Sequence, residues 1–477
     1  MTTPKRVINY VSILLSLALM ACHPTTDPIP IMTTPIQITL PLEHLVHQRD
    51  NANRAAIPVS GQAPAGSDQV RVTLTPVKGG TAEETIIVPN ADGTFSGKII
   101  GSGGAYEMSL VAKANGADVG TGRVGRVNVG EVFILYGHSV FSGGIQEEVN
   151  RFGDTRGPGA VDDRVVVATP PAGGSMPENI VDTELPRYFR PLSNSPQSIA
   201  PYQTGPYVHG LIGDKLVQQL NVPVLLLGCS FGGSNVEQSM RVIQQRPFNH
   251  SFVKYEKRMP IRPVEAAVAV YLPLTGGLRG VLMNHGANDW YNVDAERMTG
   301  PQEYADRVKV VLAYIRQITK QADLTVWQAV DNQPVPNALD LTQITKGQEL
   351  VIAQIPNVRR GADMSKLQVS DRPDNVHLAR SGFERYAQAW ADVLTKAALD
   401  ATNVPTVQGT NTPTINHLVG TLTANVYAYG PAIGLVVAVV LLVVVAWQRR
   451  STLMWAAGGL AAVAGAVVIS RAPKATA

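Results

Sequence analysis

Short apolar runs alternate with helix-like stretches between residues 130 and 400, and this alternation constrains the fold more than any other feature of the chain. Strands that alternate with helices predict a parallel sheet with helices on both faces. The sequence therefore predicts a three-layer α/β domain over 130–400. The apolar runs are 132–136, 222–227, 280–283 and 324–330, and the helical stretches include 208–220 and 301–321.

The preceding region, 41–129, has a different pattern. Apolar Val70, Val72 and Leu74 alternate with polar neighbours, and the turn-like segment 90–93 separates two further strand-like runs. Short alternating strands between Gly and Asp turns favour a small β-sandwich of the immunoglobulin or fibronectin type III kind. Segments rich in Pro, Thr and Asn, at 23–40 and 401–425, are expected to be linkers.

The N-terminus has the pattern of an export signal. Lys5 and Arg6 precede a short apolar stretch, 7–21, which ends at Cys22. Residues 19–22 resemble the lipobox of bacterial lipoproteins, so 1–22 is expected to be a lipoprotein-type signal with Cys22 lipidated. An ordinary signal peptide that contains a cysteine is the alternative.

The C-terminus suggests two membrane-spanning helices within 426–470. Two uncharged apolar runs, 429–447 and 452–470, flank a short segment that contains Arg449 and Arg450. Each run is long enough to cross a bilayer, and the arginines would face the cytoplasm. The sequence thus predicts an exported, membrane-anchored protein with its α/β domain on the outer side.

Charge and cysteine content exclude some classes of function. Charged residues make up 16% of the chain and the formal net charge is +3, without a clustered basic face, so we expect no nucleic-acid partner. The two cysteines, Cys22 and Cys229, lie in unlike contexts, and a disulfide between them is not expected. Cys229 follows an apolar run, which favours a buried thiol.

Polar and glycine-rich segments follow the apolar runs. In an open parallel sheet, ligands bind at the carboxyl ends of the strands, so these segments should meet at one edge. Taken singly, a serine, histidine or asparagine in such a segment is more simply a turn or structural residue. The segments are Gly137-His138-Ser139, residues 228–234 with Gly232 and Gly233, residues 284–289 with His285 and Asn288, and Asp374-Asn375-Val376-His377.

Together, in this order, the four segments resemble the blocks of the SGNH hydrolase superfamily, and most closely its sialate O-acetylesterase-like carbohydrate esterases. The resemblance covers about 130–398 and implies a flavodoxin-like α/β fold. It also implies a triad of Ser139, Asp374 and His377.

The chemistry of these residue types agrees with that triad. A serine hydroxyl needs a base to become nucleophilic, which His377 can supply, while Asp374 would orient the imidazole. The oxyanion would be bound by the N–H groups of Ser139 and of Gly232 or Gly233, and, as the superfamily implies, by the side chain of Asn288.

Two positions depart from the related esterases, which usually carry glutamine where this chain has His138 and often where it has His285. An imidazole N–H can donate a hydrogen bond, so both are possible substrate or oxyanion contacts. Because the charge of an imidazole can change near neutral pH, we expect an unusual pH dependence or an altered substrate. The same histidines with His377 and Asp289 offer an alternative, a zinc site, although their spacing is not typical of one. We expect no metal and no cofactor.

The sequence thus predicts a serine esterase that removes O-acetyl or similar acyl groups, on carbohydrates, through an acyl-Ser139 intermediate. The alternative is a catalytically impaired protein of the same fold that binds glycans at a surface.

Overall fold

The structure is a computed structural model that describes residues 34–143, 157–171, 179–192, 197–290, 299–331, 342–372 and 377–411. The chain divides into two compact units, Met1–Thr410 and Asn411–Ala477. Only Asn411 of the second unit is among the described residues, so the following account concerns the first.

The N-terminal part is a β-sandwich. Alternation along β5 points Val70, Val72 and Leu74 into its core, where all three are fully buried. One sheet has the order β2-β4-β7, and the other contains β6, β5, β8 and the first part of β9. Residues expected to belong to a linker contribute β1 and β2. The strands are β1 (Thr34–Pro35), β2 (Gln37–Leu40), β3 (Val46–Gln48), β4 (Arg54–Gln62), β5 (Gln69–Pro76), β6 (Glu83–Ile87), β7 (Thr94–Ser102), β8 (Gly104–Ala114) and β9 (Ala117–Gly137).

The following part is an α/β layer with the strand order β11-β10-β14-β9-β15-β16-β17. All neighbours in this order pair in parallel except β11, an antiparallel edge strand. β12 and β13 form a separate two-stranded sheet. The strands are β10 (Val165–Ala168), β11 (Phe189–Pro191), β12 (Gln197–Ser198), β13 (Thr204–Gly205), β14 (Val224–Gly228), β15 (Gly280–Asn284), β16 (Thr325–Val330) and β17 (Val358–Asp363).

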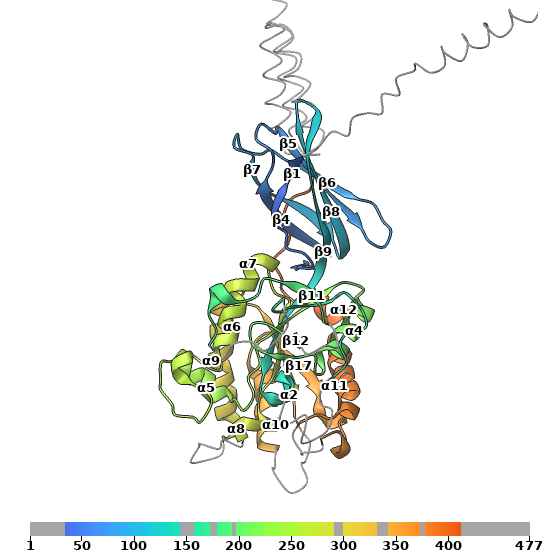
Figure 1. The fold of residues 1–477 in the computed structure, drawn as a ribbon. Helices are drawn as coiled ribbons and strands as arrows, with labels where there is room; N and C mark the ends of the chain where they lie inside the picture. The colour runs from blue at the N-terminus through green and yellow to red at the C-terminus, as the bar shows by residue number, and fades with distance from the viewer. Residues whose placement is uncertain are drawn as a thin grey trace, which may run out of the picture. The chain divides into compact units, whose positions relative to one another are not determined.

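Helices cover both faces of the parallel strands (Figure 1). One buried apolar cluster includes residues of α5, α6, α9 and α10, and a second includes residues of α4, α11 and α12. Two cores on opposite faces explain why the strands are apolar throughout. The helices are α2 (Ser139–Ser142), α4 (His209–Leu220), α5 (Val236–Ile243), α6 (Arg262–Ala266), α7 (Leu272–Thr275), α8 (Ala287–Trp290), α9 (Pro301–Thr319), α10 (Thr342–Gln354), α11 (Arg380–Val393) and α12 (Lys396–Asp400).

Strand β9 corrects the predicted fold class. Its 21 residues pair with β8 in the sandwich and then with β14 and β15 in the α/β layer. The two parts therefore share one mixed 12-stranded sheet, and the expectation of a purely parallel sheet preceded by a separate sandwich is wrong. Gly130 lies where β9 passes between them; a Cβ there would lie 1.8 Å from the carbonyl oxygen of Pro223, so only glycine fits.

The membrane prediction is also corrected. In the described part of the chain, no helix is both long and apolar enough to cross a bilayer. The longest helix described, α9, has 19 residues but carries charged side chains, including Glu303 and Arg316. The expected hairpin at 426–470 and Cys22 lie outside the described residues. We therefore retain neither the spanning hairpin in the fold class nor the membrane-anchored localisation.

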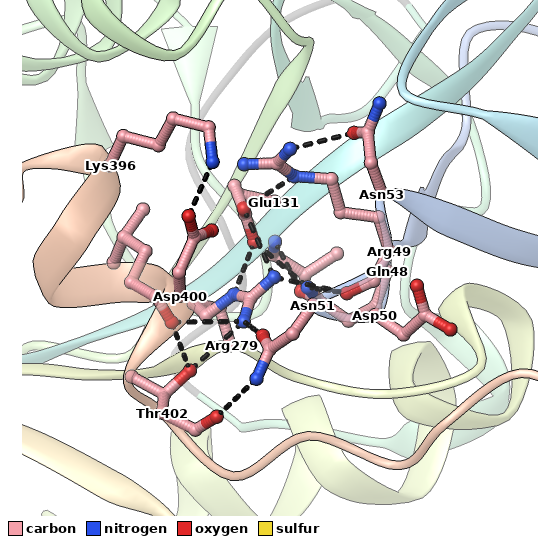
Figure 2. A network of polar contacts seen from close by, with 12 residues as sticks. Gln48, Arg49, Asp50, Asn51, Asn53, Glu131, Arg279, Lys396, Asp400 and Thr402 are labelled. Carbon is pink, nitrogen blue, oxygen red and sulfur yellow. Dashed lines mark hydrogen bonds and ion pairs between the residues drawn. The ribbon is translucent and has the colours of Figure 1, made fainter.

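A buried ionic network lies where β9 enters the α/β layer (Figure 2). The fully buried carboxylate of Glu131 accepts hydrogen bonds from Nε of Arg279 at 2.6 Å, Nε of Arg49 at 2.7 Å and Nε2 of Gln48 at 2.8 Å. Arg279 also donates to the hydroxyl of Thr402 at 2.9 Å. The network thus joins the sandwich, two strands of the parallel layer and the segment that follows α12.

That segment lies along the sandwich. The N–H of Val407 donates to Oδ2 of Asp50 at 2.9 Å, and Arg54 donates to the carbonyl of Val407 at 2.8 Å. Residues 401–408 were expected to belong to a linker, but Thr402 and Val407 form hydrogen bonds with the rest of the fold.

Candidate functional site

The central strand β9 lies at the point where the sheet changes winding direction. The chain adds β10 and β14 on one side of β9, and then β15, β16 and β17 on the other. Such a switch point is the usual place for a ligand in an open α/β sheet. Ser139 begins the short helix α2 directly after β9 ends at Gly137.

Residues that the sequence analysis did not single out fix the turn that carries Ser139. The carbonyl of Phe141 lies 2.9 Å from Nε2 of His209 and accepts from Nε2 of Gln203 at 3.0 Å. The ring of Phe141 stacks on Trp390, with centroids 5.5 Å apart. Phe141, the aromatic residue two positions after the serine, is the local feature of the sequence that could have indicated these contacts.

Ser139 and His377 come together across 238 residues of sequence. Oγ of Ser139 lies 2.7 Å from Nε2 of His377, and this histidine is partly buried. A hydroxyl at this distance from an imidazole nitrogen has the geometry required for proton transfer to a general base.

Asp374 lies outside the described residues, but the two ends of its segment are fixed. The N–H of Ala379 donates to the carbonyl of Asp371 at 2.8 Å. Before the segment, the buried guanidinium of Arg372 lies 3.5 Å from the buried carboxylate of Asp331, which follows β16.

The glycine block after β14 lies close to the serine. A Cβ on Gly232 would lie 3.8 Å from Cβ of Ser139, so the main chain at this point approaches the hydroxyl. Gly233 has φ of 70°, and a Cβ there would lie 2.3 Å from the ring of Phe252. The positive φ favours glycine at this position, whereas the half-exposed ring of Phe252 could move aside.

Hydrogen bonds join the segment after β15 to the segment after β14. Nδ2 of Asn288 donates to the carbonyl of Ser234 at 3.0 Å, which uses one of its two N–H bonds. Oδ1 of Asp289 accepts from the N–H of Val236 at 2.9 Å, at the start of α5. Burial raises the pKa of Asp289 to about 7. These contacts fix the loops that carry Gly232, Gly233 and Asn288 against each other.

His138 and His285 are buried next to the site and are not exposed to solvent. Their ring centroids are 5.9 Å apart, and the ring of His285 lies 4.6 Å from that of Tyr136. Burial lowers the pKa of His138 to about 3 and that of His285 well below its usual value. The expectation that His285 titrates near neutral pH is therefore wrong, because a buried imidazole without a carboxylate partner stays neutral.

The alternative zinc site is not formed. Among the described residues, which include His138, His285, Asp289 and His377, no group of three or more His, Cys, Asp or Glu side chains is placed to hold a metal ion. Cys229 is a buried free thiol, as predicted, and burial raises its pKa.

No protein-family model matches the chain, and no curated protein sequence matches it. Similar solved structures include a carbohydrate acetylesterase from Xanthomonas citri, with 15% identity, coverage of 74% of each chain and a TM-score of 0.41. A protein from Arabidopsis thaliana is 15% identical over 57% of this chain and 99% of its own, with a TM-score of 0.39. A carbohydrate esterase family 2 enzyme with a carbohydrate-binding domain, from Corynascus thermopiles (Myceliophthora fergusii), is 12% identical over 73% of this chain and 91% of its own, with a TM-score of 0.29.

Two of these three structural neighbours are thus carbohydrate esterases, at low identity. With TM-scores of this size, the function proposed below rests on the residues of the site.

Proposed function

We propose that the protein is a serine esterase that removes O-acetyl or similar acyl groups from carbohydrates through an acyl-Ser139 intermediate. The observation that carries the proposal is the distance of 2.7 Å between Oγ of Ser139 and Nε2 of His377, at the carboxyl end of the central strand.

In the proposed reaction, His377 removes the proton from Ser139 while Oγ attacks the carbonyl carbon of the ester. The tetrahedral intermediate collapses when its bond to the sugar oxygen breaks, and His377 returns the proton to that oxygen. Water, deprotonated by the same imidazole, then attacks the acyl-serine and releases the carboxylic acid and free Ser139. Asp374, in this proposal, orients His377 and stabilises its cation.

The negative charge that develops on the carbonyl oxygen needs donors fixed before the reaction begins. We assign this role to the main-chain N–H groups of Ser139 and of Gly232 or Gly233, and to the second N–H of Asn288. Removing one such donor typically costs about 2.7–4 kcal/mol of transition-state stabilisation. The hydrogen bonds of Asn288 and Asp289 between the loops support this assignment, because they hold the donors in place.

The substrate class is the finer part of the proposal. Its support is the resemblance of the four sequence blocks to the sialate O-acetylesterase-like enzymes. The positions of His138 and His285 add one constraint: because both rings are buried and neutral, they add no charge next to the serine.

Hydrolysis of 4-nitrophenyl acetate by the purified protein tests the proposal. Ser139→Ala should lower kcat by about 10⁴-fold or more, the loss typical of a missing nucleophile. Ser96→Ala, an exposed serine of β7, is the matched control and should leave the rate unchanged. Wild-type protein without activity, or a Ser139→Ala variant as active as wild type, would favour the alternative of a glycan-binding protein that has lost catalysis.

A further inference from the structure

A cleft of about 470 Å³ lies at the other end of the parallel strands, away from Ser139. One wall is the β5–β6 loop and the β7–β8 turn of the sandwich, and the other contains Arg126, Asp163 and Arg164. Arg164 directly precedes β10, whereas Ser139 follows the carboxyl end of β9, which runs parallel to β14 and, through it, to β10. The cleft is therefore separate from the site described above.

The cleft is open because its sandwich wall has glycines. Gly79 and Gly80 have φ of 59° and 116°, which other residues rarely adopt. A Cβ on Gly79 would meet no atom within 4 Å, and one on Gly80 would meet only the ring of Pro76. Main-chain amide groups of this loop therefore line a space wide enough for a small ligand.

The polar side chains of the opposite wall are already held in place. Nη2 of Arg126 lies 2.9 Å from Oδ2 of Asp163. Arg164 donates to Asn221 at 3.0 Å and pairs with Asp162 at 2.7 Å. Ordered guanidinium, carboxylate and amide groups offer donors and acceptors side by side, and little side-chain entropy remains to be lost on binding.

The charge balance excludes a phosphate-like ligand. Each arginine pairs with a carboxylate, and the lining of the cleft contains one further cation, Lys78, and one further carboxylate, Glu83. A polyanion would need cations that are not already paired. The groups present suit hydroxyls, which donate to a carboxylate and accept from a guanidinium at once.

An exposed apolar side chain lines the cleft beside these polar groups. Val77 is 48% exposed there. The described residues expose few large apolar side chains, so one at this place is informative. An apolar side chain beside fixed polar groups matches a sugar ring, which has C–H faces and a hydroxyl edge.

We propose that this cleft is a second binding site that takes a neutral saccharide unit of a glycan. The role of the bound glycan rests on the function proposed above: a polymer held here would be kept near Ser139 by a second point of attachment. The binding itself does not depend on catalysis.

The test uses the full chain with Ser139→Ala, so that esters stay intact, on an array of neutral and acidic oligosaccharides. The background variant should bind neutral glycans, and adding Arg126→Ala with Asp163→Ala should weaken that binding about tenfold, the loss expected for roughly two net hydrogen bonds. The double change removes both members of an ion pair and leaves no unpaired charge. The matched control is Arg123→Ala with Glu107→Ala, an exposed ion pair of the same sheet outside the cleft, which should bind as the background does.

Three outcomes would overturn the proposal: no neutral glycan is bound, only acidic glycans are bound, or both double variants bind alike. Hydrolysis of 4-nitrophenyl acetate by the two double variants in a Ser139 background separates this result from the proposed function. Both should retain the wild-type rate, and a wild-type protein without that activity would count against the esterase alone.

Discussion

The two ends of the parallel sheet hold buried ionic groups differently. At the amino ends, the carboxylate of Glu131 has a donor on each oxygen, from Arg49 and Arg279 (Figure 2). At the carboxyl ends, the buried pair of Arg372 and Asp331 is longer, at 3.5 Å. Buried polar atoms without a hydrogen-bond partner among the described residues occur at both ends. They include both ring nitrogens of His47 near Glu131 and both ring nitrogens of His285 near Ser139.

This difference bears on stability. A buried carboxylate that is tightly paired fixes the junction of two parts of the fold, because removing it leaves two buried cations unpaired. The comparison predicts that the largest loss of stability follows a change at the amino ends, and that changes near Ser139 affect stability less.

The largest effect on stability is expected from Glu131→Ala. It leaves Arg49 and Arg279 buried without their carboxylate, and breaking a buried ion pair in this way typically costs about 3–5 kcal/mol. The free energy of unfolding, measured by urea denaturation, should fall by that amount. The control Glu107→Ala breaks an exposed pair and should have little effect. Equal stability of the two variants would show that the buried network around Glu131 does not stabilise the junction.

A smaller, pH-dependent effect is expected from Asp289. Burial raises its pKa from 3.8 to about 7, so the folded state favours the protonated acid. Asp289 therefore contributes stability that is fully present below about pH 4. This contribution is lost as the pH rises from about 4 to about 7, and it stays lost above that range.

Asp289→Asn keeps an oxygen that can accept from Val236 but cannot ionise. Thermal unfolding measured from pH 4 to pH 8 should show a weaker fall in stability with pH for this variant than for wild type. Parallel curves would mean that Asp289 does not carry the pH dependence.

The smallest effect is expected from His285→Gln. Because burial keeps this imidazole neutral, removing it should leave the shape of the kcat/KM profile against pH unchanged between about pH 5 and 9. A lost or shifted limb of the profile would show that His285 titrates in the working range, and would restore the expectation drawn from the sequence.

The sequence predicted well where local patterns carry the information. Apolar runs marked β9, β14, β15 and β16, and the residues after them were expected at one edge because parallel strands end together. Ser139 and His377 lie at that edge within hydrogen-bonding distance. Their catalytic roles, and that of Asp374, remain predictions.

The rest depended on contacts between distant residues. Glu131 was not singled out from the sequence, because its partners lie 82 and 148 positions away. The continuity of β9 was missed because both of its halves read as strand and nothing in the composition shows that they are one. His138 and His285 were expected as possible substrate or oxyanion contacts. Their burial could not be predicted, because it is decided by neighbours such as Tyr136.

The most direct test of the account is the site and rate of labelling by a fluorophosphonate, mapped by mass spectrometry. The account predicts one adduct, on Ser139, that forms at least about 100-fold more slowly in His377→Ala, as expected when a general base is lost. No adduct, an adduct on another serine such as Ser142, or an equal rate in His377→Ala would contradict the claim that His377 activates Ser139.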